Sequence, residues 1–82
     1  MRELDIYTDI CRIERDKAKV LTSTAELFEI LADNDQETAR TAGKIGALIA
    51  DILVLGSGLG LEYDIMYAKI NEELKIRAAA NG

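Results

Sequence analysis

The chain has 82 residues, with 15 acidic side chains against 10 lysines and arginines, no proline and a formal net charge of −5. A chain of this length forms one domain (residues 1–82) and buries only about 60–65% of its unfolded surface, so its own core is marginal. We therefore expect a homodimer or a homotetramer. The acidic excess argues against a nucleic-acid partner, because phosphate-backbone binding needs a clustered basic face. A metal cation or a metal–nucleotide complex fits the charge better.

Signals for secretion and membrane insertion are weak in the sequence. Cys11 is the only cysteine, and the opening sequence MRELDIY lacks the basic flank and apolar run of a signal peptide. The apolar part of residues 42–61 is about 17 residues long and is interrupted by Asp51 and by glycines, which is short for a membrane span. We expect a cytoplasmic protein without a membrane partner.

The first predicted helix covers residues 2–33, which contain no proline or glycine. Its apolar residues recur at helical spacing in two adjacent rows, one containing Phe28 and the other containing Leu27. Such a wide stripe is expected to pack against more than one neighbour. Ser23 and Glu26 form a capping-box pattern, but no helix breaker precedes them, so we predict one continuous helix.

Charged residues within this helix fall into two groups. In the run of residues 12–19, Arg12 with Asp16 and Glu14 with Lys17 are spaced for ion pairs on a solvated face. The second group consists of two glutamates further along the helix, for which a more specific role is possible.

Glu26 and Glu29 lie three residues apart and project from nearly the same face, at the margin of the apolar stripe. Two carboxylates placed in this way can share a cation whose oxygen ligands they supply. An ordinary acidic edge is the alternative interpretation of the same spacing.

The second predicted helix covers residues 36–55, with Asp35 as its N-cap. Arg40, Lys44 and Asp51 fall on one stripe of this helix. Asp51 stands among Ile, Leu and Val residues, where a carboxylate costs several kcal/mol unless it meets a cation, a proton or hydrogen-bond donors. Asp51 is therefore a candidate functional residue.

The glycine-rich stretch at residues 56–60 is interpreted as the end of this helix and the turn into a third one. Its spacing is not that of the dinucleotide-binding pattern, and no strand precedes it. In the third helix, Met66, Ile70 and Leu74 are expected to face inward. Together these elements predict an all-α fold, an antiparallel bundle of about three helices that is completed by homo-oligomerisation.

Residues 25–31, AELFEIL, look like the E-E-x-x-E helix of the MazG-like all-α nucleoside triphosphate pyrophosphohydrolases. Residues 47–53, ALIADIL, look like its E-E-L-A-D-V-L segment, and residues 59–62, LGLE, resemble the L-G-I-D that opens its next helix. The likeness covers most of residues 17–77.

This resemblance implies a Mg²⁺ ion held by an acidic quartet, which binds a nucleoside triphosphate and cleaves it to a nucleoside monophosphate and pyrophosphate. Glu26 and Glu29 match the first two acids, and Asp51 matches the last. They are therefore the candidate metal-binding and catalytic residues. Leu48 stands where the family has its third acid.

The resemblance also implies basic and amide side chains near the phosphates, late in the last helix. Lys69, Asn71 and Arg77 occupy that region, with spacing altered from the family pattern. Lys44, on the same helix as Asp51, is a further candidate phosphate-binding residue.

Two alternatives to the enzyme remain open. In one, the chain is a relative that has lost catalysis and binds a nucleotide or a protein, and Leu48 is the feature that separates this possibility from the enzyme. In the other, the chain is a helical assembly or adaptor module in which Asp51 pairs with Lys44, with Arg40 or with a cation of a partner chain.

Overall fold

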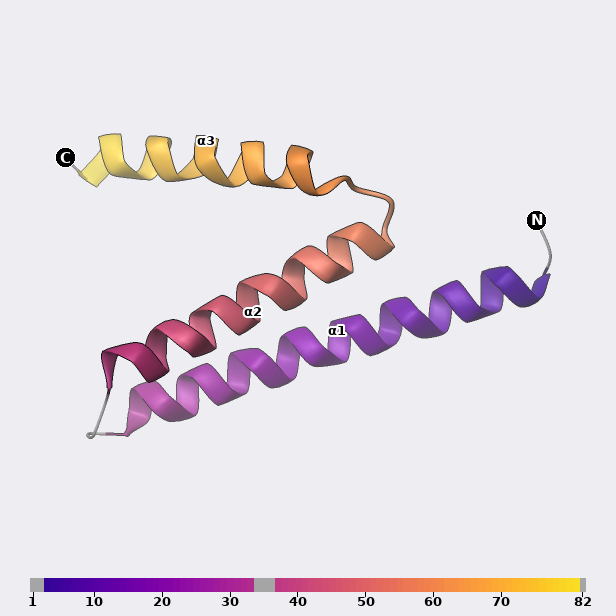
Figure 1. Cartoon of the computed structure of the whole chain (residues 1–82), viewed down its shortest axis with the longest axis horizontal. Helices are drawn as coiled ribbons and strands as arrows, with labels where there is room; N and C mark the ends of the chain where they lie inside the picture. The colour runs from indigo at the N-terminus through magenta and orange to yellow at the C-terminus, as the bar shows by residue number, and fades with distance from the viewer. Residues whose placement is uncertain (1–2, 34–36, 82) are drawn as a thin grey trace.

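Three helices and no strands make up the part of the chain that the computed structural model describes, residues 3–33 and 37–81. They are α1 (Glu3–Ala32), α2 (Thr38–Gly58) and α3 (Tyr63–Asn81). The first two form an antiparallel hairpin, and α3 turns back on the side of α2 that is remote from α1 (Figure 1). The prediction of an all-α chain with three helices is confirmed.

The helix boundaries differ from the predicted ones in detail. The continuity of α1 is confirmed, so Ser23 does not cap a helix but lies within one. Glu37 is the N-cap of α2 and makes no capping hydrogen bond with its side chain, while the predicted cap Asp35 lies outside the described residues. At its other end, α2 continues past the predicted limit at Leu55 to Gly58.

The turn between α2 and α3 is set by backbone hydrogen bonds. The amide of Leu61 donates to the carbonyl of Gly56, and that of Gly60 donates to the carbonyl of Ser57, both at 3.0 Å. Gly60 has a φ of +94°, a region that side-chain-bearing residues rarely adopt. This pair of bonds around a positive-φ glycine is the Schellman motif that commonly ends helices. The predicted turn is confirmed.

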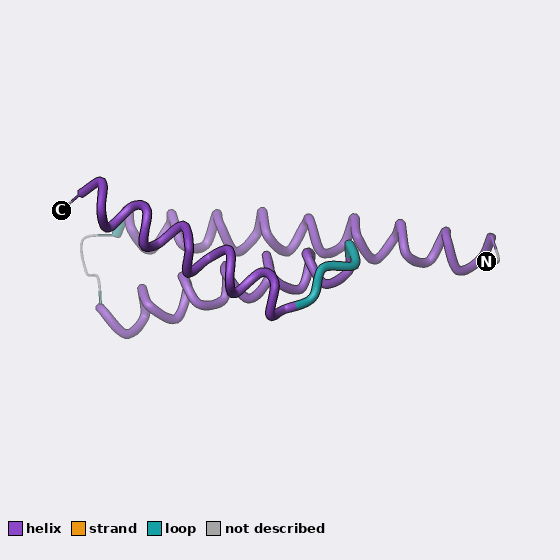
Figure 2. The backbone as a smooth tube through the Cα atoms, turned by 90° about the horizontal axis from the view of Figure 1, so that it is seen from above, coloured by secondary structure: helices purple, strands orange, loops and turns teal. Residues whose placement is uncertain are grey.

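Few side chains are buried in the described residues. Leu27 and Ile30 are the buried apolar residues, and both belong to α1. At the start of α3, Met66 packs on Gly56 of α2, where an added Cβ would overlap the Met66 sulfur. The prediction that Ile70 and Leu74 face inward is wrong for a single chain, because both are exposed on the part of α3 that diverges from α2 (Figures 1 and 2).

Candidate functional site

The interface between α1 and α2 has a regular spacing on both helices. Six of the less exposed positions of α1 recur at intervals of three and four residues: Ile13, Asp16, Val20, Ser23, Leu27 and Ile30. Five of the half-buried positions of α2 follow the same rule: Thr41, Lys44, Leu48, Asp51 and Leu55. This alternation is the heptad spacing of a coiled coil, so the hairpin is a short antiparallel coiled coil. We call these eleven positions the seam.

Among the polar contacts between described residues of α1 and α2, two involve candidate site residues. The Ser23 hydroxyl donates a hydrogen bond to Oδ2 of Asp51, and the Lys44 ammonium donates to Oε2 of Glu26 at 3.2 Å. The structure therefore brings Glu26 and Asp51, which come from different sequence motifs, to the same interface. Asp51 has a hydroxyl partner in its apolar surroundings, and Lys44 pairs with Glu26 and not with Asp51 as the assembly alternative expected.

Glu29 is placed differently from Glu26. It is exposed, and at 100° per residue it lies a further 60° or so away from the seam than Glu26 does. The described residues contain no group of three or more Asp, Glu, His or Cys side chains that could hold a metal ion. Of the three candidate carboxylates, a single chain thus presents Glu26 and Asp51 at the α1–α2 interface and Glu29 on the outer side of α1.

Leu48 lies in the seam between Lys44 and Asp51 and is half-buried. A longer acidic side chain at position 48 would leave α2 on the side that faces α1, as Asp51 does. The position that the resemblance assigns to the third acid is therefore within the same interface, although an apolar side chain occupies it.

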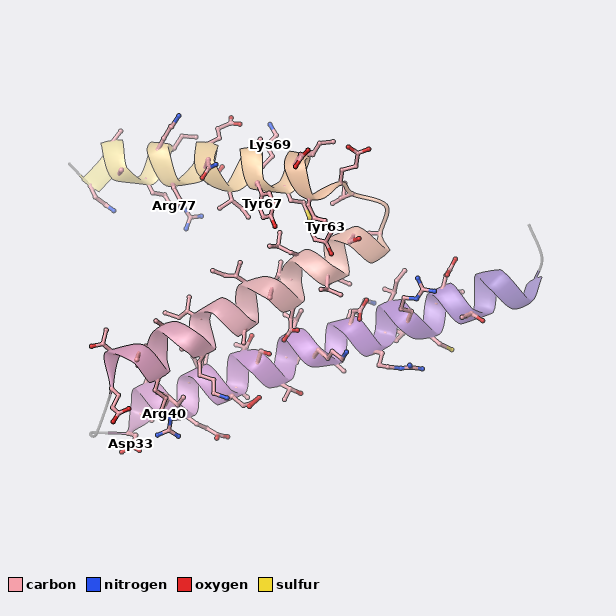
Figure 3. The ribbon with its side chains drawn as sticks, in the orientation of Figure 1. Asp33, Arg40, Tyr63, Tyr67, Lys69 and Arg77 are labelled. Atoms are coloured by element: carbon pink, nitrogen blue, oxygen red, sulfur yellow. The ribbon has the colours of Figure 1, made fainter. Side chains whose placement is uncertain are left out.

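The cations predicted to bind phosphate on α3 pair with acids of their own helix. Lys69 lies 3.4 Å from Glu72, Arg77 lies 3.7 Å from Glu73, and Asn71 is exposed. Lys69 points away from α2, whereas Arg77 points towards it (Figure 3). Within the described ranges α3 has no contact with α1, so the structure does not bring these residues to Glu26.

Arg40 also stands apart from Asp51. It lies near the start of α2, beside Asp33 at the end of α1 (Figure 3). Arg40 and Asp51 are eleven positions apart, which corresponds to about 16 Å along the helix. The pairing of these two residues that the assembly alternative considered is therefore not formed within the chain.

Of the two ion pairs predicted in residues 12–19, one is formed and one is not, and one of the four residues, Asp16, lies in the seam. Glu14 and Lys17 form the predicted ion pair at 2.9 Å. The predicted pair of Arg12 with Asp16 is wrong, because Arg12 lies 3.6 Å from Asp9 instead. Asp16 is 7% exposed and its carboxylate lies against Gly58 at the end of α2.

Comparison with protein-family models, with curated proteins and with solved structures found no match. Within the described part of the chain, α2 is the one helix that is long and apolar enough to cross a membrane by length and composition alone. Core helices of soluble proteins can meet the same criterion. The seam residues Lys44 and Asp51 lie on this helix, where both contact α1.

Proposed function

We propose that this protein is a MazG-like, Mg²⁺-dependent nucleoside triphosphate pyrophosphohydrolase that releases a nucleoside monophosphate and pyrophosphate. The observation that carries the proposal is that Glu26 and Asp51 both lie at one helix interface, where each pairs with a residue of the other helix. These residues come from the two acidic motifs in residues 25–31 and 47–53, which resemble those of the family. The proposal places the protein in the cytoplasm, where Cys11 stays a free thiol.

The carboxylates of the hairpin fit a metal–nucleotide complex. Mg²⁺ is commonly held by one or two carboxylates, with water and substrate phosphates completing its shell. Glu26 and Asp51 supply two half-buried carboxylates, and Glu29 is a third on the same helix as Glu26. When bound, Mg²⁺ would neutralise phosphate charge and activate the attacking water.

Lys44 and Ser23 have distinct roles in this proposal. The Lys44–Glu26 pair is partly exposed, at 37% and 44%, so separating it costs about 1 kcal/mol or less. When a metal–nucleotide complex binds, Glu26 can therefore bind the metal ion and Lys44 can bind a phosphate. The carboxylate and the ammonium then each exchange one oppositely charged partner for another. Ser23 donates to one Asp51 oxygen and fixes the orientation of that carboxylate.

Three residues of α3 complete the proposed phosphate site. Lys69, Asn71 and Arg77 are exposed and able to reach an anionic ligand, since their acidic neighbours on the helix surface hold them weakly. This assignment requires α3 to move towards the hairpin when the nucleotide binds.

Pyrophosphate release from a panel of nucleoside triphosphates with Mg²⁺ tests the proposal. We expect release by the natural chain, loss of release in Asp51→Asn, and no change in Asp9→Asn, which removes an exposed carboxylate elsewhere on the hairpin. Release no greater than that of Asp51→Asn, for every nucleotide, overturns the proposal. Leu48→Glu restores an acid at the third family position and is expected to raise the rate.

A second candidate is a non-catalytic relative that binds a nucleotide, and one observation favours it. Glu26 and Asp51 already have partners within the hairpin, and Leu48 leaves the seam without a third acid. Thermal melts with Mg²⁺ and a non-hydrolysable triphosphate separate this candidate from an assembly module that binds no nucleotide. Ligand binding to the native state raises the thermal midpoint. A midpoint that is unchanged with every nucleotide would leave the assembly module as the remaining alternative.

A further inference from the structure

Outside the seam, α1 and α2 each carry a second row of large apolar side chains. Leu21 and Phe28 form the row on α1, and Ile45, Ile49 and Ile52 form the row on α2. All five are exposed, from 42% for Ile45 to 72% for Leu21. We call these five residues the apolar face.

The two rows lie on the same side of the hairpin. At about 100° per residue, the row on α1 is rotated by roughly 120° and the row on α2 by roughly 90° from the seam of its own helix, in the same sense. Because the helices are antiparallel, rotations of the same sense turn both rows to one side. Glu26 is rotated by roughly 90° in the opposite sense, so the Glu26–Lys44 pair and the candidate site are reached from the other side.

The surface area of the chain is that of a molecule with an uncovered interface. It exposes 6601 Å², whereas a compact monomer of 9.0 kDa exposes about 4,900 Å². The excess of about 1,700 Å² is spread over the whole elongated chain, α3 included, and leaves room for the roughly 1,000–2,500 Å² that one partner buries in an obligate homodimer, whose interfaces total about 2,000–5,000 Å². The radius of gyration, 16.0 Å, also exceeds the roughly 12 Å of a compact chain of this length.

We propose that the apolar face is the contact between two copies of this chain in a two-fold symmetric dimer. In the described residues, Leu27 and Ile30 are the buried apolar side chains, which is a small core for a stable fold. The partner that covers the apolar face must therefore be present whenever the chain folds, and a second copy of the chain meets this condition. The five residues of the face are uncharged, and Lys17, which lies on the same side of α1 one turn before Leu21, is paired with Glu14 at 2.9 Å. Pairing the face with itself, as two-fold symmetry requires, therefore brings no unpaired like charges together. This inference is independent of the proposed activity.

A matched pair of substitutions on α2 tests the proposal. Ile49 and Val54 are both 45% exposed, but Val54 lies on the side of the hairpin opposite to the apolar face. By sedimentation equilibrium we expect the natural chain to dimerise. Ile49→Glu should weaken the dimer by at least about 30-fold, and Val54→Glu should leave the dissociation constant unchanged. Equal weakening by both substitutions overturns the assignment of the face, and a natural chain that is monomeric at all concentrations overturns the dimer.

A measurement on the natural chain covers the case in which Ile49→Glu fails to fold. The thermal midpoint of an obligate dimer rises with protein concentration, and a midpoint that is constant over a hundredfold range overturns the proposal. Since α2 passes the length and composition test for a membrane span, co-sedimentation with zwitterionic and anionic phospholipid vesicles is the third measurement. A natural chain that is monomeric without vesicles and binds them through Ile49 assigns the face to a lipid surface and overturns the dimer.

Discussion

The α1–α2 hairpin and α3 are held in the fold by different means. The hairpin has a continuous seam that contains both apolar and polar contacts. Leu27 is buried in it, and the Ser23–Asp51 hydrogen bond crosses it. By contrast, α3 depends on the backbone geometry of its turn and on Met66 against Gly56. The difference shows that side-chain packing determines the register of the hairpin, whereas the turn alone sets where α3 begins and which way it leaves.

The surface of α3 fits this contrast. Tyr67 and Ile70 lie on one side of the helix, while Ile65 and Ile76 lie nearly opposite, and all four are exposed. A helix that is apolar on opposite sides packs between two neighbours. Within the described residues α3 contacts only α2, and only near the turn. The single chain therefore leaves most of the packing capacity of α3 unused.

The largest expected effect comes from the core of the hairpin. Leu27→Ala is expected to lower the free energy of unfolding by about 2–4 kcal/mol, because Leu27 is 8% exposed and its removal leaves a cavity. Leu74→Ala makes the same change on α3, where the side chain is 59% exposed, and should cost less than about 0.5 kcal/mol. Urea titrations at one fixed protein concentration measure both values. Equal costs would show that α3 is packed as firmly as the hairpin.

The next effect concerns the turn that directs α3. Gly60→Ala is expected to cost about 1–2 kcal/mol, because its φ of +94° strains any residue that has a Cβ. Gly43→Ala is the matched control, since Gly43 lies inside α2 with open space around the position of a new Cβ. There the gain in helix propensity should stabilise the protein by about 0.5–1 kcal/mol. Thermal melts should therefore shift in opposite directions, and shifts of the same sign would contradict the role assigned to the turn.

The outline of this fold follows from the sequence, because helix breakers and glycine positions are local signals. The absence of proline and glycine before Asp33 predicted the continuous α1, and Gly60 marked the turn before α3. The prediction that Ile70 and Leu74 face inward is wrong for a single chain, since helical periodicity identifies a face but not the element that covers it. In this chain the turn carries that face away from the hairpin.

The candidate site was only partly predictable for a related reason. Two acids of the proposed quartet, Glu26 and Asp51, lie at one interface, each paired with a residue of the other helix. The partners of these acids depend on the register between two antiparallel helices, which a single-helix pattern does not contain. Ser23 and Asp16 were missed as seam residues because pattern analysis searches for apolar side chains. The signal that identifies them is their three–four spacing with Val20 and Leu27.

A double-mutant cycle measures how much the Ser23–Asp51 hydrogen bond adds to the seam. Ser23→Ala and Asp51→Ala should each destabilise the hairpin, and the coupling between them should be about 1 kcal/mol. The same cycle on Lys69 and Glu72, an exposed pair on α3, should give about 0.5 kcal/mol or less. A coupling for Ser23 and Asp51 no larger than that of the α3 pair would mean that this hydrogen bond does not stabilise the packing of α1 on α2.

The smallest expected effect has the opposite sign and comes from the other end of the seam. Asp16 is 7% exposed and lies against Gly58, the last residue of α2, where the helix dipole repels a negative charge. Asp16→Asn keeps the shape of the side chain and removes that charge, so it should stabilise the protein by about 0.5–1 kcal/mol. Asp9→Asn, which removes an exposed carboxylate from the same helix, should change stability by less than about 0.5 kcal/mol. A loss of stability in Asp16→Asn would show that hydrogen-bond donors at the end of α2 stabilise the negative charge of Asp16. Asp16 would then be a hydrogen-bonded seam residue, as Asp51 is.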